Sequence, residues 1–160
     1  MKSRITLPKY LQSMKPIWLI LLFITSTLSA QTDCDLISIS GGASHSLALK
    51  NDGTVWAWGW NNRGQLGDGT NTAQNIAVQA SNLNGVIAIS SGDGYSLALK
   101  NDGAVWAWGS NSNGELGNGA NGFNTDQNIP VQTSNLNGII AISSGYGHSV
   151  ALKNDGTVWA

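Results

Sequence analysis

Charged residues are scarce in this sequence. They account for 11% of its 160 residues, and the formal net charge at pH 7 is −1. Beyond residue 30, four basic residues stand against nine acidic ones, which gives that part a net charge of −5. A protein that binds nucleic acid needs a concentrated basic face to displace counterions from phosphates, and the sequence has no such cluster. The composition therefore excludes nucleic acid as a partner.

Cysteine is almost absent, and long apolar runs are absent too. Cys34 is the one cysteine. In an exported chain, a single cysteine is a free thiol or pairs with a partner outside the chain, and its place in a linker favours no functional role. The apolar run Ile17–Ile24 is shorter than the roughly 20 residues of a membrane-spanning helix. The sequence therefore predicts no stable membrane span.

The first 30 residues have the order of a secretory signal. Four basic residues and no acidic residue precede the apolar run, and small and polar residues follow it up to Ala30. This order predicts a signal peptide at residues 1–30 and a secreted or cell-surface protein. Met14 would also begin a compact signal, so the start of translation stays open between Met1 and Met14.

The sequence contains one passage three times. Ser46–Gly59 returns as Ser96–Gly109 and again as Ser149–Ala160, at spacings of 50 and 53 residues. A period of this size is typical of propellers and solenoids, which use one supersecondary unit per repeat. We expect the chain to be the start of a longer protein that holds the rest of the propeller, because two units and a fragment cannot close a ring. The predicted segments are a linker at 31–36, repeat 1 at 37–85, repeat 2 at 86–138 and a partial repeat 3 at 139–160.

Each repeat predicts four antiparallel strands. A β-branched run bounded by glycine forms the first strand, and Leu47 to Leu49 alternate in the second. Asn51–Gly53 is a hairpin turn signal. Val55–Gly59 forms the third strand, and a shorter run near Ile76–Gln79 forms the fourth. Four short strands per repeat predict an all-β fold, a β-propeller of four-stranded blades.

These motifs resemble the repeat of the regulator of chromosome condensation family. Gly-x-x-His-Ser-Leu-Ala-Leu, Asp-Gly-x-Val-Trp-x-Trp-Gly and Asn-x-x-Gly-Gln-Leu-Gly-x-Gly end at residues 49, 59 and 69. They recur in the second repeat with Tyr95 in place of the histidine and Glu115 in place of the glutamine. The resemblance covers residues 37–160 and, with the signal, indicates a bacterial, secreted member. It implies about seven blades in the complete protein and a role as an interaction platform.

Residues that could perform chemistry fall at repeated positions. His45 and His148 are the two histidines and share one repeat position, whereas a catalytic histidine is normally unique and paired. Asp68–Thr72 lacks the spacing and the terminal glutamate of a calcium loop. No Gly-x-Gly-x-x-Gly motif follows a strand and opens a helix. The sequence therefore predicts no enzyme, no catalytic residue, no metal site and no cofactor.

Residues that differ between the repeats are the candidates for binding. Trp60 and Arg63 align with Ser110 and Asn113, and the loop that follows is three residues longer in the second repeat. Tryptophan, tyrosine and arginine are enriched at protein-interaction hot spots, although loops also vary without a function. The candidate protein-binding residues are Trp60, Arg63, Tyr95, Phe123 and Tyr146.

The sequence as a whole predicts a secreted repeat protein that acts as a non-catalytic protein-interaction scaffold. The predicted partner is an extracellular protein or glycan whose identity the sequence leaves open. The alternative is the propeller part of a larger extracellular enzyme or carbohydrate-binding protein whose active residues lie beyond Ala160. In both cases the repeated tryptophans are predicted to pack the sheets and not to stack on a ligand: Trp56, Trp58, Trp106 and Trp108.

Overall fold

The computed structural model describes residues 35–160, and the regular elements of this range are eleven strands. The predicted signal peptide, Cys34 and most of the predicted linker lie outside the described residues. The all-β fold and the four strands per repeat are confirmed for the first two repeats.

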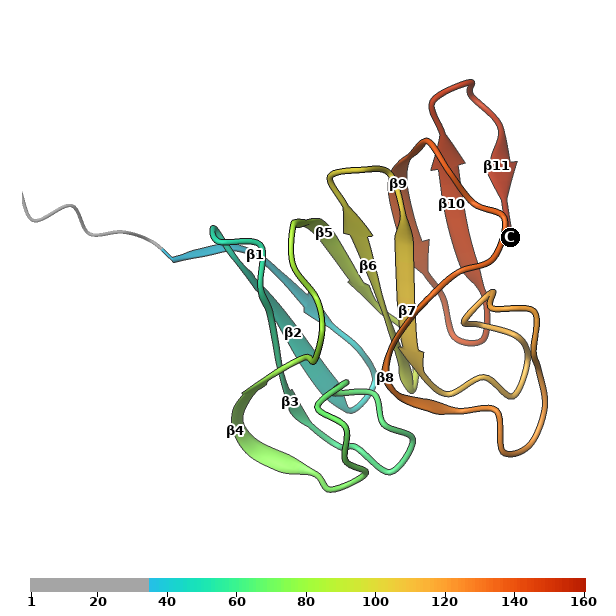
Figure 1. Ribbon diagram of the computed structural model, residues 1–160. Coiled ribbons are helices and arrows are strands. Elements are labelled where there is room, and N and C mark those ends of the chain that lie inside the picture. The colour runs from blue at the N-terminus through green and yellow to red at the C-terminus, as the bar shows by residue number, and fades with distance from the viewer. Residues whose placement is uncertain (1–34) are drawn as a thin grey trace, which may run out of the picture. The chain divides into compact units, whose positions relative to one another are not determined.

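The strands form three antiparallel sheets that follow one another along the chain (Figure 1). The first sheet contains β1 (Leu36–Gly41), β2 (His45–Lys50), β3 (Val55–Gly59) and β4 (Gln74–Gln79). The second sheet contains β5 (Val86–Ser91), β6 (Tyr95–Lys100), β7 (Val105–Gly109) and β8 (Gln127–Gln132). The third sheet contains β9 (Ile139–Ser144), β10 (Ser149–Lys153) and β11 (Val158–Trp159). Within each sheet, strands that follow one another in the sequence pair with each other. β4 begins at Gln74, slightly earlier than predicted.

The hairpin turn between β2 and β3 also ties the first sheet to the second. Gly53 has a φ of 78° and donates its N–H to the Lys50 carbonyl, which closes the predicted turn. The carbonyl of Gly53 accepts the N–H of Val86, the first residue of the next sheet, at 3.2 Å. A Cβ on Gly53 would lie 2.9 Å from the nitrogen of Gly85. Glycine is therefore required both by the backbone angle and by the close approach of the two segments.

Alternate residues of each strand point to opposite faces of its sheet, so each face can pack against a neighbouring sheet. The sheets stack face against face in this way. Buried side chains of the first two sheets form one core, which includes Leu47, Leu49, Val55, Leu66, Ala98 and Trp108. A second core joins the second and third sheets through Leu99, Val105, Ile139 and Ala151. The middle sheet is thus buried on both faces.

The two tryptophans of β3, and likewise the two of β7, fall on one face of their sheet. Trp108 is fully buried between the first and second sheets, as predicted for a packing residue. Trp58 holds the same repeat position in the first sheet but is only half-buried, since its side chain points away from the second sheet. Trp56 is also half-buried, and the Lys50 ammonium lies 4.8 Å from the centre of its ring.

Candidate functional site

The loops that follow β3 and β7 are each held by one buried asparagine. The Asn61 side-chain oxygen accepts the N–H of Leu66 at 3.0 Å, and its side-chain nitrogen donates to the carbonyls of Thr70 and Thr72, both at 3.1 Å. Asn111 repeats the arrangement with the N–H of Leu116 at 3.1 Å. Buried and satisfied side-chain amides fix a loop in one conformation. The residues between these bonds are therefore presented on a rigid support.

A cavity of about 370 Å³ opens among the loops at this edge of the sheets. We call it the loop pocket. It is lined by residues of all three repeats. The first repeat contributes Ser44, Trp60, Asn62, Arg63 and Gln65, the second contributes Asp93, Gly94, Ser110, Ser112, Asn113 and Glu115, and the third contributes Tyr146.

Three of the five predicted binding residues therefore lie together. Trp60 is 55% exposed and Tyr146 is 81% exposed, and both line the loop pocket with Arg63. Trp60 follows β3 and Tyr146 lies in the loop between β9 and β10, so the stacking of the sheets brings the two residues to one surface. The structure gathers aromatic and cationic groups that are distant in the sequence.

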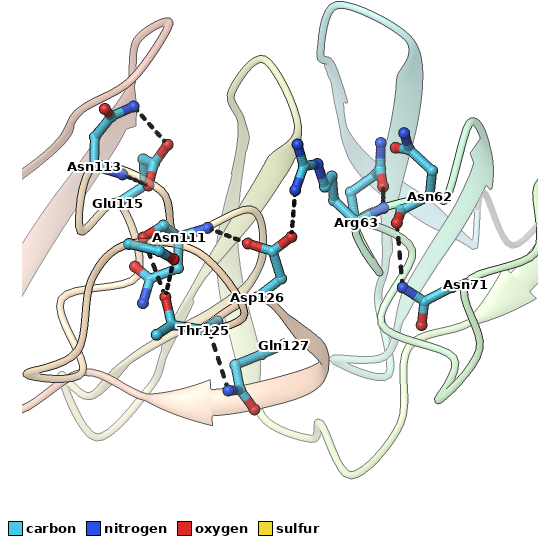
Figure 2. Close-up of polar contacts among 11 residues, drawn as sticks. Asn62, Arg63, Asn71, Asn111, Asn113, Glu115, Thr125, Asp126 and Gln127 are labelled. Atoms are coloured by element: carbon cyan, nitrogen blue, oxygen red, sulfur yellow. Dashed lines mark hydrogen bonds and ion pairs between the residues drawn. The ribbon is translucent and has the colours of Figure 1, made fainter.

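The Arg63 side chain is fixed across the boundary between two repeats. Its Nη1 atom lies 3.0 Å from Oδ2 of Asp126, and Oδ1 of the same carboxylate accepts the N–H of Asn111 at 3.0 Å (Figure 2). The Arg63 backbone N–H donates to Oε1 of Gln65 at 3.0 Å. A guanidinium has five N–H donors, so this pair leaves donors free to bind a carbonyl or carboxylate of a partner.

Two carboxylates line the loop pocket and differ in their surroundings. Glu115 is buried, and its two oxygens accept the backbone and side-chain N–H groups of Asn113 at 2.9 and 3.1 Å (Figure 2). Asp93 is exposed in the loop between β5 and β6. Glu115 therefore supports its own loop, whereas Asp93 is available to a partner.

Tyr95 does not belong to this surface. It is fully buried, and its hydroxyl donates to the carbonyls of Gly145, at 3.2 Å, and His148 in the next sheet. Burial also raises the pKa of this hydroxyl. The prediction that Tyr95 contacts a partner conflicts with its burial, and the side chain instead joins two sheets.

His45 joins sheets at the same repeat position as Tyr95. Its Nε2 lies 2.9 Å from the Ser96 hydroxyl, which itself donates to the carbonyl of Gln65 at 2.8 Å. The hydroxyl has one proton, so it must accept from Nε2–H. Nδ1 of His45 is then a buried lone pair that has no hydrogen-bond partner among residues 35–160. Burial lowers the pKa of His45 to about 4. This histidine is a neutral link between sheets.

Phe123 is separate from the loop pocket. It lies in the longer loop between β7 and β8 and is 91% exposed, but it is not among the residues that line the cavity.

Sequence reasoning missed Asp93, although a signal was present. Ala43, Asp93 and Tyr146 occupy one repeat position in the loop after the first strand, and their side chains are unrelated in size and charge.

The described part of the chain contains no group of three or more His, Cys, Asp or Glu side chains that could hold a metal ion. In residues 35–160, no helix is long and apolar enough to cross a membrane.

Comparisons with known proteins identify the repeat. The family described as "Regulator of chromosome condensation (RCC1) repeat" matches residues 52–99 and 102–152, and a second family of the same description matches 36–65 and 86–115. The Ultraviolet-B receptor UVR8 of Arabidopsis thaliana is 43% identical over 56 residues, which are 35% of this chain and 13% of that protein. The human protein named Probable E3 ubiquitin-protein ligase HERC6 is 33% identical over 147 residues, 86% of this chain and 14% of that protein.

Solved structures share the arrangement of the sheets. Human WBSCR16 is similar with a TM-score of 0.67 and 26% identity, over 77% of this chain and 32% of that one. Yeast RCC1 (Prp20), solved bound to Kap60, is similar with a TM-score of 0.66 and 26% identity, over 77% of this chain and 28% of that one. The chain thus spans about a third or less of the length of the relatives it matches.

Proposed function

The chain belongs to the regulator of chromosome condensation (RCC1) repeat family, and from this premise we propose that it is a non-catalytic module that binds another protein through the loop pocket. The supporting observation is the convergence of Trp60, Arg63 and Tyr146 on one cavity that spans three repeats. These are the residue types that carry most of the binding energy in protein interfaces.

The geometry of the loop pocket favours recognition. Trp60 and Tyr146 present apolar rings with polar edges, and Arg63 is held in place by Asp126 before any partner arrives. A side chain that is already ordered loses less entropy on binding, which raises affinity. The pocket is lined by serines but by no histidine, cysteine or lysine of the described residues that could activate one of them as a nucleophile.

The partner proposed here is an extracellular protein that offers an apolar side chain to Trp60 and a carbonyl or carboxylate to Arg63. A protein partner has a precedent among the relatives, since the yeast RCC1 structure holds Kap60. Export is a second part of the proposal and depends on residues 1–30, which lie outside the described residues. Amino-terminal sequencing of the exported protein tests it, with Gln31 expected as the first residue.

The binding proposal is tested with three variants of the chain used as bait for proteins of the culture medium. We expect the wild-type chain to retain a partner protein. The Trp60→Ala and Tyr146→Ala variants should bind this partner at least tenfold more weakly, because hot-spot truncations cost about 2 kcal/mol or more. Phe123→Ala is the matched control, since it removes an exposed aromatic ring outside the loop pocket.

Calorimetry with the purified partner measures the affinities. Equal affinity of Trp60→Ala, Tyr146→Ala and the Phe123→Ala control would remove the loop pocket from the interface. Specific binding of a glycan, lost in Trp60→Ala, would instead support the carbohydrate-binding alternative that the sequence left open.

A further inference from the structure

The charged residues of the loop pocket give it an excess of negative charge. Its lining contains one cation, Arg63, and two carboxylates, Asp93 and Glu115. Arg63 is already paired with Asp126 at 3.0 Å, and Glu115 accepts only N–H groups of the neutral Asn113 (Figure 2). The lining residues and Asp126 together have one positive and three negative charges, a net charge of −2.

Asp93 is the carboxylate that a partner can reach. It is exposed, and the two ion pairs among residues 35–160 do not include it. His45 lies near Asp93 but does not neutralise it. Burial lowers the pKa of this histidine to about 4, and the opposing effect of the Asp93 charge is smaller. Asp93 is therefore an unpaired anion at neutral pH.

The lysines of the described residues lie far from the loop pocket. Lys50, Lys100 and Lys153 end β2, β6 and β10. Ser44 and Gly94, which line the pocket, precede β2 and β6 and so lie at the other ends of these strands. A strand of six residues is about 20 Å long, and charges are screened beyond about 8 Å at physiological ionic strength. These lysines therefore do not offset the charge of the pocket.

Aromatic rings and hydrogen-bond donors line the same cavity as Asp93. Asp93 belongs to the middle repeat, Trp60 to the first and Tyr146 to the third. A Cβ on Gly94, the residue after Asp93, would lie 4.0 Å from Cγ of Arg63. The loop of Asp93 therefore lies against the stem of the ordered arginine. Aromatic faces attract cations, and the remaining N–H donors of Arg63 suit a neutral carbonyl.

We propose that the loop pocket binds a lysine or arginine side chain of the partner protein, which pairs with Asp93 and lays its stem against Trp60 and Tyr146. A peptide carbonyl beside that residue accepts an N–H of Arg63. A carboxylate of the partner would be repelled by the three carboxylates of the site. The cavity volume of about 370 Å³ lies in the usual range of ligand pockets, about 300–1,000 Å³.

This inference rests on the function proposed above and names the group of the partner that the pocket binds. The charge of the rest of the chain agrees with it. Beyond residue 30 the net charge is −5, which attracts a basic surface and raises its rate of association.

NMR titration of the 160-residue chain with three blocked peptides tests the proposal. The peptides are acetyl-Ala-Leu-X-Ala-amide, in which X is lysine, norleucine or glutamate. Norleucine keeps the apolar stem of lysine and lacks its charge. We expect the lysine peptide to bind about threefold or more tightly than the norleucine peptide, as an accessible ion pair allows, and the glutamate peptide to bind most weakly. Added salt should weaken binding of the lysine peptide and leave that of the norleucine peptide unchanged.

Two aspartate variants locate the charge. Asp93→Asn keeps the shape of the side chain and removes its charge, so it should abolish the preference for the lysine peptide over the norleucine peptide. Asp102→Asn is the matched control, because Asp102 is also exposed but lies in the turn between β6 and β7 and does not line the pocket. Its Oδ1 atom accepts the N–H of Ala104 at 3.0 Å, a bond that an asparagine oxygen can keep. Circular dichroism checks that both variants fold.

Three results would overturn the proposal. They are equal binding of the lysine and norleucine peptides by the wild type, no binding of the lysine peptide up to its solubility limit, and the same preference in Asp93→Asn and Asp102→Asn. Failure of the inference is distinguishable from failure of the proposed function. If Trp60→Ala weakens binding of the partner protein and Asp93→Asn does not, the loop pocket remains the interface without a bound cation. If neither Trp60→Ala nor Tyr146→Ala weakens it, the interface itself is wrong.

Discussion

Truncation of the two equivalent tryptophans should show how far stacking between sheets stabilises the fold. Trp58 and Trp108 occupy the same repeat position in the sequence Val-Trp-Ala-Trp-Gly, but Trp108 is fully buried and Trp58 is half-buried. We expect Trp108→Ala to destabilise the 160-residue chain much more than Trp58→Ala. The comparison is internally controlled, since the amino acid, the strand position and the substitution are the same.

The expected magnitudes follow from burial. Removal of a fully buried tryptophan side chain costs about 3–5 kcal/mol, because apolar contact is lost and a cavity remains. The indole also donates to the Gln65 carbonyl, a bond that contributes about 1 kcal/mol within that total. A half-buried ring has roughly half of this area to lose, so Trp58→Ala should cost about 1–2 kcal/mol.

Thermal unfolding followed by circular dichroism measures the difference. At about 3–4 °C per kcal/mol for a chain of this size, Trp108→Ala should lower Tm by roughly 10–20 °C and Trp58→Ala by roughly 3–8 °C. Urea titration gives the free energies of unfolding and shows through the m-value whether both variants unfold from the same state. Equal losses of stability would refute the claim that the face between the first and second sheets carries the packing energy.

Two further predictions concern the links between sheets. His45 has a pKa of about 4 in the folded chain and an ordinary value of 6.5, so below pH 6.5 the unfolded state gains a proton that the folded state does not. The free energy of unfolding should therefore keep its full value above pH 6.5 and fall by up to about 3 kcal/mol towards pH 4. Urea titrations of the wild type and of His45→Gln should differ in this pH dependence. An identical pH dependence would contradict the buried neutral state of His45. Gly53→Ala should lower the free energy of unfolding by more than about 1 kcal/mol, because Gly53 has both a positive φ and a Cβ position 2.9 Å from the Gly85 nitrogen. Gly156 has a φ of 85° and open space around it, so Gly156→Ala should cost less in the same urea titration. A reversed order would show that the contact with Gly85 is unimportant.

The sequence predicts most of the fold because the signals are local and are repeated. Alternating residues specify the faces of the strands, and the Asn-Asp-Gly turn specifies the hairpin, so both elements are found without knowledge of their neighbours. Burial of an individual side chain is different, since it depends on which sheet stacks on which face. Trp58 and Trp108 have the same local sequence and differ in burial for this reason alone.

The sequence predicts only part of the candidate site, again because the stacking of the sheets is not a local signal. Trp60, Arg63 and Tyr146 were found by their residue type, but their convergence on one cavity depends on the stacking of three repeats. Tyr95 was assigned to the surface by residue type as well. Its repeat position argued otherwise, because His45 occupies that position one sheet earlier and also bonds to the next sheet.

Comparison of equivalent positions therefore separates scaffold from site better than residue type does. At the position of His45 and Tyr95 the side chain changes while its role is kept, since both link their sheet to the next one through a hydrogen bond. At the position of Ala43, Asp93 and Tyr146, no shared contact explains the residues, and the last two line the loop pocket. A repeat position whose residues vary without a common structural role is free to be shaped by a partner. By this argument Asp93 belongs with Trp60, Arg63 and Tyr146 in the proposed binding surface.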